Sequence, residues 1–417
     1  MSITHERRSG GALFSDLVET LPDGTTRLPA AVHPMPDLLE LSAEEVLARF
    51  KASQQQDFTA VIRALEDPAN PLHQMLHELR AIAAQQPGNP FAQHRLFAPG
   101  ALQAMFLDLH NHVMDHPVWR HPFFVRVFEG RISQPQLAAF ALHYFNQIKN
   151  TRQCVALALG RFSSVMPLPY GVLNERVSEL TQIVLAQLVA DEYGVGSHAV
   201  EDYPTMGGLF QSTTHIVMYR QLFEGLGIPF EQQDVALLPG VADNVLTQRL
   251  VAGSEEFTPL ESLASVGLGM EWGVPEFFSL LLGGMIRFAR DNDVPLTQRH
   301  LLVFIAHVRY DVLHAIAVML VTSFFAREER DIDAIKNATN TLMAGRYGMM
   351  TELYRHVFGE ACPALAEIGL DPRYHLRDRR IETALRRARA QVAEGTVQDA
   401  AAYRARQDTP YVFAAGV

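Results

Sequence analysis

Two histidines and an aspartate interrupt an otherwise apolar segment, FIAHVRYDVLHAIAVM, at residues 304–319. An α-helix turns about 100° per residue, so His307, Asp311 and His314 would point within about 60° of one another. Two neutral imidazoles and a carboxylate on one buried face are costly unless a cation lies among them. The spacing therefore predicts a metal-ligating face. The alternative is a buried His–Asp hydrogen-bond pair beside a surface histidine.

Two glutamates elsewhere in the chain also lie in apolar surroundings. Glu192 closes the run QIVLAQLVADEYG, and Glu271 lies within ASVGLGMEWGVPEFF, where Gly267 and Gly269 would let a helix approach its neighbour closely. Each glutamate also has a simpler interpretation: Glu192 could be a solvated last-turn residue, and Glu271 could pair with an arginine. Taken with the 307–314 segment, they predict a shared centre between helices.

The chain that must position these residues has 417 residues, of which 48% are hydrophobic and 19% charged. In its longer segments the apolar residues recur with a period nearer 3.6 than 2, which predicts an all-α protein. Ser42 and Glu45 form a capping-box pattern that opens a short helix ending near Phe50. Further helices are expected at about 57–66, 70–85, 100–115, 134–162, 173–193, 212–226, 259–287, 297–327, 331–358 and 377–394.

Four segments together resemble a known family. They are HPFFVRVFEGRISQPQLAAFALHYF (121–145), ADEYGVG (190–196), SVGLGMEWGVPEFF (265–278) and HVRYDVLH (307–314). The order of these residues, two glutamates followed by HxxxDxxH, resembles the pattern of the haem-oxygenase-like diiron oxidases, which are relatives of TenA thiaminase and pyrroloquinoline-quinone synthase. The resemblance spans about residues 105–358. It implies a haem-oxygenase-like seven-helix bundle at 101–360, with a partly helical N-terminal extension (1–100) and a C-terminal helix and tail (361–417).

The resemblance also implies a set of metal ligands. By position these are Glu192, Glu271, His307, Asp311 and His314, with His307 and Asp311 expected on the same ion. For the sixth ligand, HIVMYRQLFEGLGI (215–228) matches the family segment that carries a histidine, so His215 is the candidate. His198 is closer in sequence to Glu192 and is the alternative.

One departure bears on the reaction. Family members that oxidise nitrogen can add a carboxylate from the opening helix, but this chain has no acid between Gly130 and Asn174 and offers only His143, Gln147 and Asn150 there. The implied activity is therefore a non-haem diiron oxidase that uses two Fe²⁺ ions and O2 on a small amino- or carboxyl-bearing metabolite, by C–H oxidation, desaturation or C–C cleavage. The alternatives are an N-oxygenase of an amino-acid-derived amine, or a metal-free TenA-like hydrolase or ligand-binding protein. An external electron donor is possible.

Bulk properties exclude several other classes. The formal charge of −11 gives no general reason to bind nucleic acid, and we expect no stretch long and apolar enough to cross a membrane. With only Cys154 and Cys362, the chain lacks a disulfide framework and fits a reducing cytoplasm. The N-terminal extension is expected to pack on the bundle and to cover the pocket mouth or build a homodimer.

A histidine cluster and a cysteine are two further candidates for chemistry that have ordinary structural interpretations. Four histidines in LHNHVMDHPVWRHPFF (109–124) form a cluster that Pro117 interrupts, so a second metal site there is disfavoured. Nothing in the sequence around Cys154 would activate its thiol, so we expect Cys154 to be a buried core residue rather than the nucleophile of a TenA-type hydrolase.

Overall fold

The computed structural model describes residues 19–20, 26–27, 37–162, 168–194, 214–363 and 378–393. Within these residues, all regular structure is helical except for a two-residue antiparallel ladder between β1 (Glu19–Thr20) and β2 (Thr26–Arg27). The α-helices are α2 (Ala43–Glu66), α3 (Pro71–Ala84), α4 (Pro99–Met114), α5 (Pro122–Phe128), α6 (Gln134–Gly160), α7 (Asn174–Glu192), α8 (His215–Gly225), α9 (Pro239–Gly253), α10 (Pro259–Ala264), α11 (Val274–Asn292), α12 (Leu302–Ser323), α13 (Glu329–Phe358) and α14 (Arg379–Ala393). The all-α prediction is confirmed.

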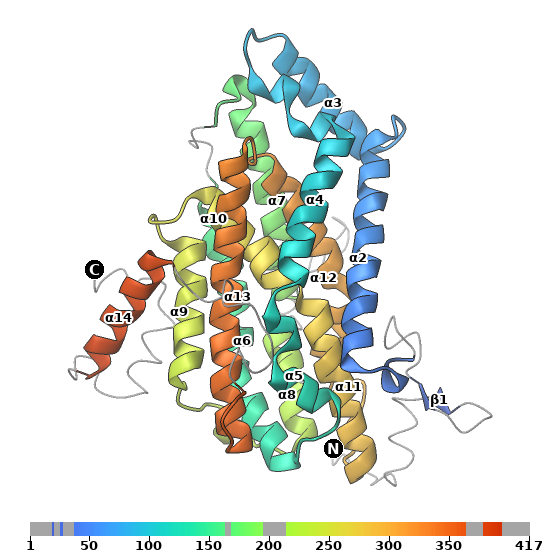
Figure 1. Ribbon diagram of the computed structural model, residues 1–417, viewed down its shortest axis with the longest axis vertical. Coiled ribbons are helices and arrows are strands. Elements are labelled where there is room, and N and C mark those ends of the chain that lie inside the picture. Colours follow the sequence, from blue (N-terminus) through green and yellow to red (C-terminus); the bar gives the residue numbers. More distant parts are fainter. Residues whose placement is uncertain are drawn as a thin grey trace, which may run out of the picture.

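The long helices form a bundle along the long axis of the molecule (Figure 1). Helix α13 packs against α9, α10 and α6, while α12 packs against α11 and α7. Between α10 and α11, residues Ser265–Glu271 form a π-helix that contacts both α12 and α13. This π-helical segment therefore lies at the centre of the bundle.

The N-terminal helices belong to the same packed body. The predicted capping box is present, since Ser42 Oγ accepts from the Glu45 backbone N–H and the Glu45 carboxylate accepts from that of Ser42. Phe58 of α2 stacks on Trp272 with ring centroids 4.6 Å apart, and Gln54 donates to the Trp272 carbonyl at 3.1 Å. Helix α2 thus covers the residue that follows Glu271.

Several predicted boundaries were wrong. Helix α2 runs unbroken through 51–56, because Lys, Ala and Gln are good helix formers. The single helix expected at 259–287 is divided by the π-helical segment, and the short helix α5 was not among those expected. Helix α9 was missed, since it is buried on all sides, with Asn244, Thr247 and Gln248 inside, and so shows no amphipathic period.

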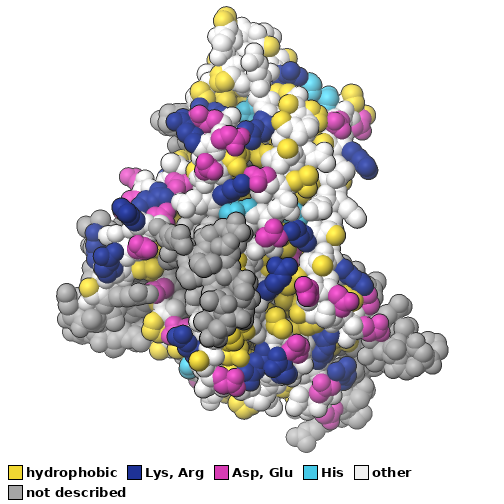
Figure 2. All heavy atoms as spheres, in the orientation of Figure 1, with side chains coloured by type: hydrophobic (Ala, Val, Ile, Leu, Met, Phe, Trp, Pro, Cys, Tyr) yellow, Lys and Arg dark blue, Asp and Glu magenta, His cyan; other side chains and the backbone are white. Residues whose placement is uncertain are grey.

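The chain surface carries mixed charge. On the face shown in Figure 2, basic and acidic side chains are interspersed. At the C-terminal side, Arg380 of α14 pairs with Glu261 at 2.7 Å and Asp378 at 2.8 Å, which ties α14 to the start of α10. Among the described residues no single helix is long and apolar enough to cross a bilayer; the two parts of α12, bent by 45°, pass that test only when joined.

Candidate metal centre

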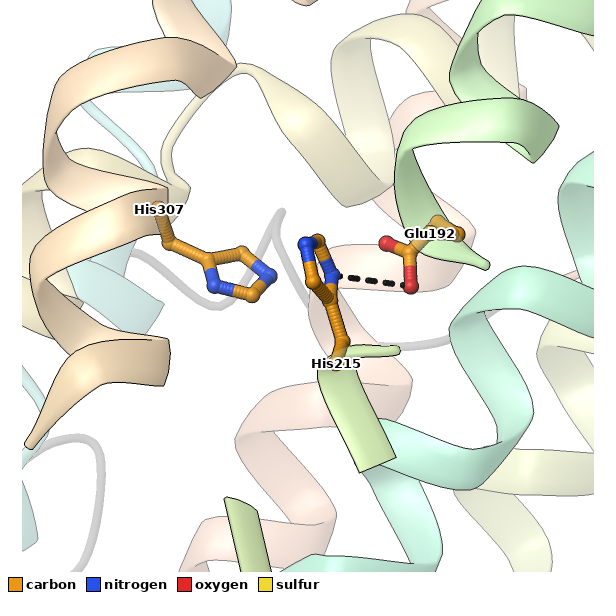
Figure 3. Close-up of side chains that lie close together, drawn as sticks. All are labelled: Glu192, His215 and His307. Atoms are coloured by element: carbon orange, nitrogen blue, oxygen red, sulfur yellow. Dashed lines mark ion pairs between the residues drawn. The ribbon is translucent and has the colours of Figure 1, made fainter. Parts of the chain in front are cut away.

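Three side chains from three helices meet in a first ligand group: Glu192, His215 and His307. Their ligand atoms all lie within 4.8 Å of one another. Glu192 is the last residue of α7, His215 the first of α8, and His307 lies on α12, with the three side chains facing one another in Figure 3. Glu192 Oε2 is 3.0 Å from His215 Nδ1, and the two imidazole centroids are 4.5 Å apart. Chain segments far apart in sequence thus converge on one small volume.

Local sequence explains why His215 is held there. Thr214 is the N-cap of α8, and its Oγ1 accepts from the Val217 backbone N–H at 3.2 Å. The helix expected at 212–226 is present, beginning at His215, and it places His215 at a helical position facing Glu192. The alternative ligand His198 lies outside the described residues.

Glu271, Asp311 and His314 form a second ligand group, whose ligand atoms also lie within 4.8 Å of one another. Glu271 ends the π-helical segment, and π-helical turns are frequent at functional sites because the extra residue redirects side chains. The close approach predicted for Gly267 and Gly269 is present. A Cβ on Gly267 would lie 2.4 Å from Val318 of α12, and one on Gly269 would lie 3.1 Å from Leu342 of α13.

Helix α12 supplies ligands to both groups. Its two parts, Leu302–Val308 and Leu313–Ser323, are bent by 45° relative to each other, with Asp311 at the break. His307 consequently lies in the first group, whereas Asp311 and His314 lie in the second. This division differs from the expectation, implied by the family resemblance, that His307 and Asp311 would serve the same ion.

The carboxyls of the two groups experience opposite electrostatic effects. Burial, then the charge of Glu192, raises the pKa of Glu271 to about 8, and burial followed by Glu271 raises that of Asp311 well above its ordinary value. Burial also acts on Glu192, but the adjacent His215 outweighs it and the pKa of Glu192 is lowered. Asp311 Oδ2 is buried and has no hydrogen-bond partner among the described residues. A nearby cation would therefore stabilise the ionised carboxylates of the second group.

Two of the imidazoles have partners that would orient them toward a metal. His307 Nδ1 lies 2.6 Å from the Val303 carbonyl, and an N–H on Nδ1 would leave Nε2 as the free ligand atom. Burial, then His215, lowers the pKa of His307 to about 3, so its imidazole is neutral, as a ligand must be. His314 Nε2 lies 2.8 Å from Asp191 Oδ2, with Nδ1 3.9 Å from Asp311 Oδ1. Sequence reasoning missed Asp191, although it directly precedes Glu192.

The two groups face one cavity of about 20 Å³, which is roughly the space needed by one water molecule. Glu192, His307, Glu271 and Asp311 contribute to its lining. The rest of the lining comes from Tyr144, Gln147, Ile148, Thr151, Met270, Val274, Phe277, Phe278 and Arg346. Trp272, which follows Glu271 directly, does not line the cavity and is packed under α2.

Helix α6 presents amides rather than a carboxylate to this cavity. Gln147 and Asn150 both donate to Gln248 Oε1, at 2.9 and 2.8 Å, and Asn244 donates to Gln147 Oε1 at 2.6 Å. The polar atoms of Gln147 are thus engaged with α9. His143 packs edge-on against His356, with ring centroids 4.5 Å apart, rather than in either ligand group.

Two charged residues near the centre were not expected from the sequence. Arg346 of α13 lines the cavity and is 3% exposed. Glu276 of α11 is fully buried, neither of its carboxyl oxygens has a hydrogen-bond partner among the described residues, and burial raises its pKa to about 8. The GVPEFF sequence marks Glu276 as an acid between apolar residues, whereas nothing in the sequence around Arg346 sets it apart.

The other candidates have structural roles. His116 and His121 cap short helices, each accepting a backbone N–H at 3.1 Å, while His110 accepts from Trp272 Nε1 and His112 contacts the Lys336 carbonyl. Cys154 is fully buried, and burial raises its thiol pKa to about 12, as expected for a core residue.

No protein-family model matches the chain, and no curated protein matches it. Among solved structures, a TenA homolog from Pseudomonas syringae pv. tomato str. DC3000 is similar to it, with a TM-score of 0.45 and 10% sequence identity. The similarity covers 61% of this chain and 92% of the TenA homolog.

The donor set fits a pair of divalent transition-metal ions. Three carboxylates and three imidazoles, arranged as two groups of three, match the nitrogen and oxygen ligands that iron accepts in helical bundles. The orphaned oxygen of Asp311 and the raised pKa of Glu271 are features that nearby cations would relieve.

Proposed function

We propose that this protein is a non-haem diiron oxidase that uses O2 to oxidise a small metabolite. The observation that supports this most strongly is that the six candidate ligands, from α7, α8, α12 and the π-helical segment, form two groups that both contribute to the lining of one cavity, through Glu192, His307, Glu271 and Asp311. Two ferrous ions, when bound, supply redox chemistry with O2 that amino-acid side chains cannot perform.

The residues of this chain would have distinct tasks. Glu192, His215 and His307 would hold one ion and Glu271, Asp311 and His314 the other, while Asp191 and the Val303 carbonyl would fix the orientation of two imidazoles. Phe277, Phe278, Met270 and Val274 would exclude water from the cavity.

Oxidation at carbon is favoured over N-oxygenation. Helix α6 brings no carboxylate to the cavity, and the oxygen of Gln147 already accepts a hydrogen bond from Asn244. C–H oxidation, desaturation and C–C cleavage all remain within this proposal. A TenA-like hydrolase is disfavoured because Cys154 is buried with a raised pKa and lies outside the cavity lining.

The test is to load the protein with Fe²⁺ without oxygen and count the bound metal. We expect about two ions per chain for the wild type and a clear loss in His307→Ala and Asp311→Asn. His73→Ala on α3, remote from both groups, is the matched control and should bind as the wild type does.

Mixing the loaded protein with O2 then tests the chemistry. A transient visible absorption whose appearance is accelerated by a candidate amino acid or fatty acid would support an oxidase. Absence of iron uptake by the wild type would refute the proposal.

A further inference from the structure

Arg346 is a buried cation with unused hydrogen-bond donors at the cavity. Its Nε and Nη1 atoms are fully covered and have no hydrogen-bond partner among the described residues. The guanidinium lies over the aromatic rings of Phe277 and Trp119, at 5.1 and 5.9 Å from their centroids. Ring contacts offset only part of the cost of burying a guanidinium, which requires acceptors for its N–H groups.

Two other arginines that are largely covered by the fold have such acceptors. Arg249 Nε donates to Asn150 Oδ1 at 2.7 Å, and Arg287 donates to the carbonyls of Phe128 and Leu39 at 2.6 and 2.9 Å. Arg346 differs in that it lines the cavity beside both ligand groups. Its missing acceptor is therefore expected to come from a molecule in that cavity.

The charge balance of the loaded centre indicates what kind of molecule this is. Glu271 lies close enough to Arg346 to interact with it electrostatically, but under the proposed function its carboxylate binds a metal ion. The other acids that line the cavity among the described residues, Glu192 and Asp311, belong to the ligand groups as well. None of the lining carboxylates is then free to pair with Arg346, and a bound anion would supply the acceptor that its guanidinium lacks.

We propose that Arg346 binds the carboxylate of a substrate monocarboxylic acid, whose apolar part lies against Val274, Phe277 and Phe278. A guanidinium matches a carboxylate with two parallel hydrogen bonds. Among the described residues that line the cavity, Arg346 is the only lysine or arginine, which suits one carboxylate better than a phosphate group. This assignment rests on the proposed two-metal centre.

The cavity has room for about one water molecule, so binding must move side chains of its wall. Trp119 would report that movement, because it stacks on Phe277 with ring centroids 6.0 Å apart and lies under Arg346. The chain has two tryptophans, so its intrinsic fluorescence is a usable readout of binding.

The experiment uses full-length protein loaded with Zn²⁺, which takes no part in redox chemistry, and measures metal content in every sample. Straight-chain acids from butanoate to decanoate are titrated, each against its own primary amide, by calorimetry and tryptophan fluorescence. We expect at least one acid to bind about tenfold or more tightly than its amide, because a desolvated charge pair is lost in the amide complex.

Three variants assign that preference to the guanidinium. Arg346→Gln should abolish the preference for the acid while keeping two metals per chain, and Arg346→Lys should retain part of it. Arg287→Gln, which removes another largely buried arginine, should leave it unchanged. If Arg346→Gln does not fold, the acid–amide comparison on wild type and Arg346→Lys decides the matter.

The outcomes separate the two proposals. A wild type that binds two metals but shows no preference in any acid–amide pair, or an Arg346→Gln variant that keeps the preference, overturns the assignment of Arg346 alone. A wild type that takes up no metal overturns the proposed function, and this inference with it.

Discussion

In the metal-free protein, replacing Glu271 by Gln should remove a loss of folding stability that the wild type undergoes as the pH rises. Burial and the neighbouring Glu192 raise the pKa of Glu271 from 4.5 to about 8. The folded chain therefore holds this proton more tightly than the unfolded chain does, and that stabilisation is fully present below pH 4.5 and is lost as the pH rises through 8. Since a tenfold change in a protonation constant corresponds to about 1.4 kcal/mol, the loss is on the order of 4 kcal/mol. The amide of Gln cannot ionise, so the free energy of unfolding of Glu271→Gln does not undergo this loss.

The assay is urea unfolding between pH 5 and about 8.5 in the presence of a chelator, for wild type, Glu271→Gln and the exposed control Glu231→Gln. The wild-type and Glu271→Gln curves should separate by on the order of 4 kcal/mol across this range, whereas Glu231→Gln should follow the wild type. Adding a divalent metal should then stabilise the wild type more than Glu271→Gln, which keeps only the first ligand group complete. Parallel pH profiles for wild type and Glu271→Gln would refute the argument, because the carboxylate would then be compensated without any metal.

Three further changes test the parts that surround the centre. Asp191→Asn should weaken metal binding by about 10–100-fold without changing the number of ions bound at saturation, because Asp191 orients His314 rather than binding an ion; a titration of metal uptake checks this. Gly267→Ala should cost about 1–3 kcal/mol of unfolding free energy, since its Cβ would clash with α12, whereas Gly348→Ala, with nothing within 4 Å, should be neutral or stabilising in thermal melts. Phe58→Ala should cost about 3–5 kcal/mol by removing a buried ring that docks α2, and a loss below about 1 kcal/mol in urea unfolding would mean that the N-terminal helices are only loosely attached.

The sequence predicted the helical class and most of the long helices, because amphipathic period and capping residues are local signals. Ser42 with Glu45 is an example in which one short pattern identified a helix start correctly. Helix α9 was missed for the opposite reason. It is surrounded by other helices, and its buried Asn244 and Gln248 are satisfied by partners about a hundred residues away. Hydrogen bonds between residues so far apart produce no pattern in the neighbouring sequence.

All six residues predicted to be ligands lie in the two groups, yet their division between the groups did not follow from helical geometry. A straight helix would keep His307 and Asp311 on one face, but α12 bends by 45° between its two parts. Glu271 likewise depends on a π-helical segment, a backbone form that the sequence around the two glycines did not reveal. The sequence thus pointed to residues that the fold brings together, while departures from regular helix accompany their division into two groups.

These departures occur where the candidate ligands converge, and the proposed metal centre supplies a reason for them. Glu192 is the last residue of one helix, His215 the first of another, Glu271 ends the π-helix and Asp311 lies at the bend. Each is a place where a regular helix is interrupted or ends, at some cost in backbone hydrogen bonding. A bundle needing only a packed core would gain stability from apolar residues at these positions. A bound pair of cations would stabilise the folded chain and so offset this cost. Metal titration of the wild type and of Glu271→Gln measures that stabilisation.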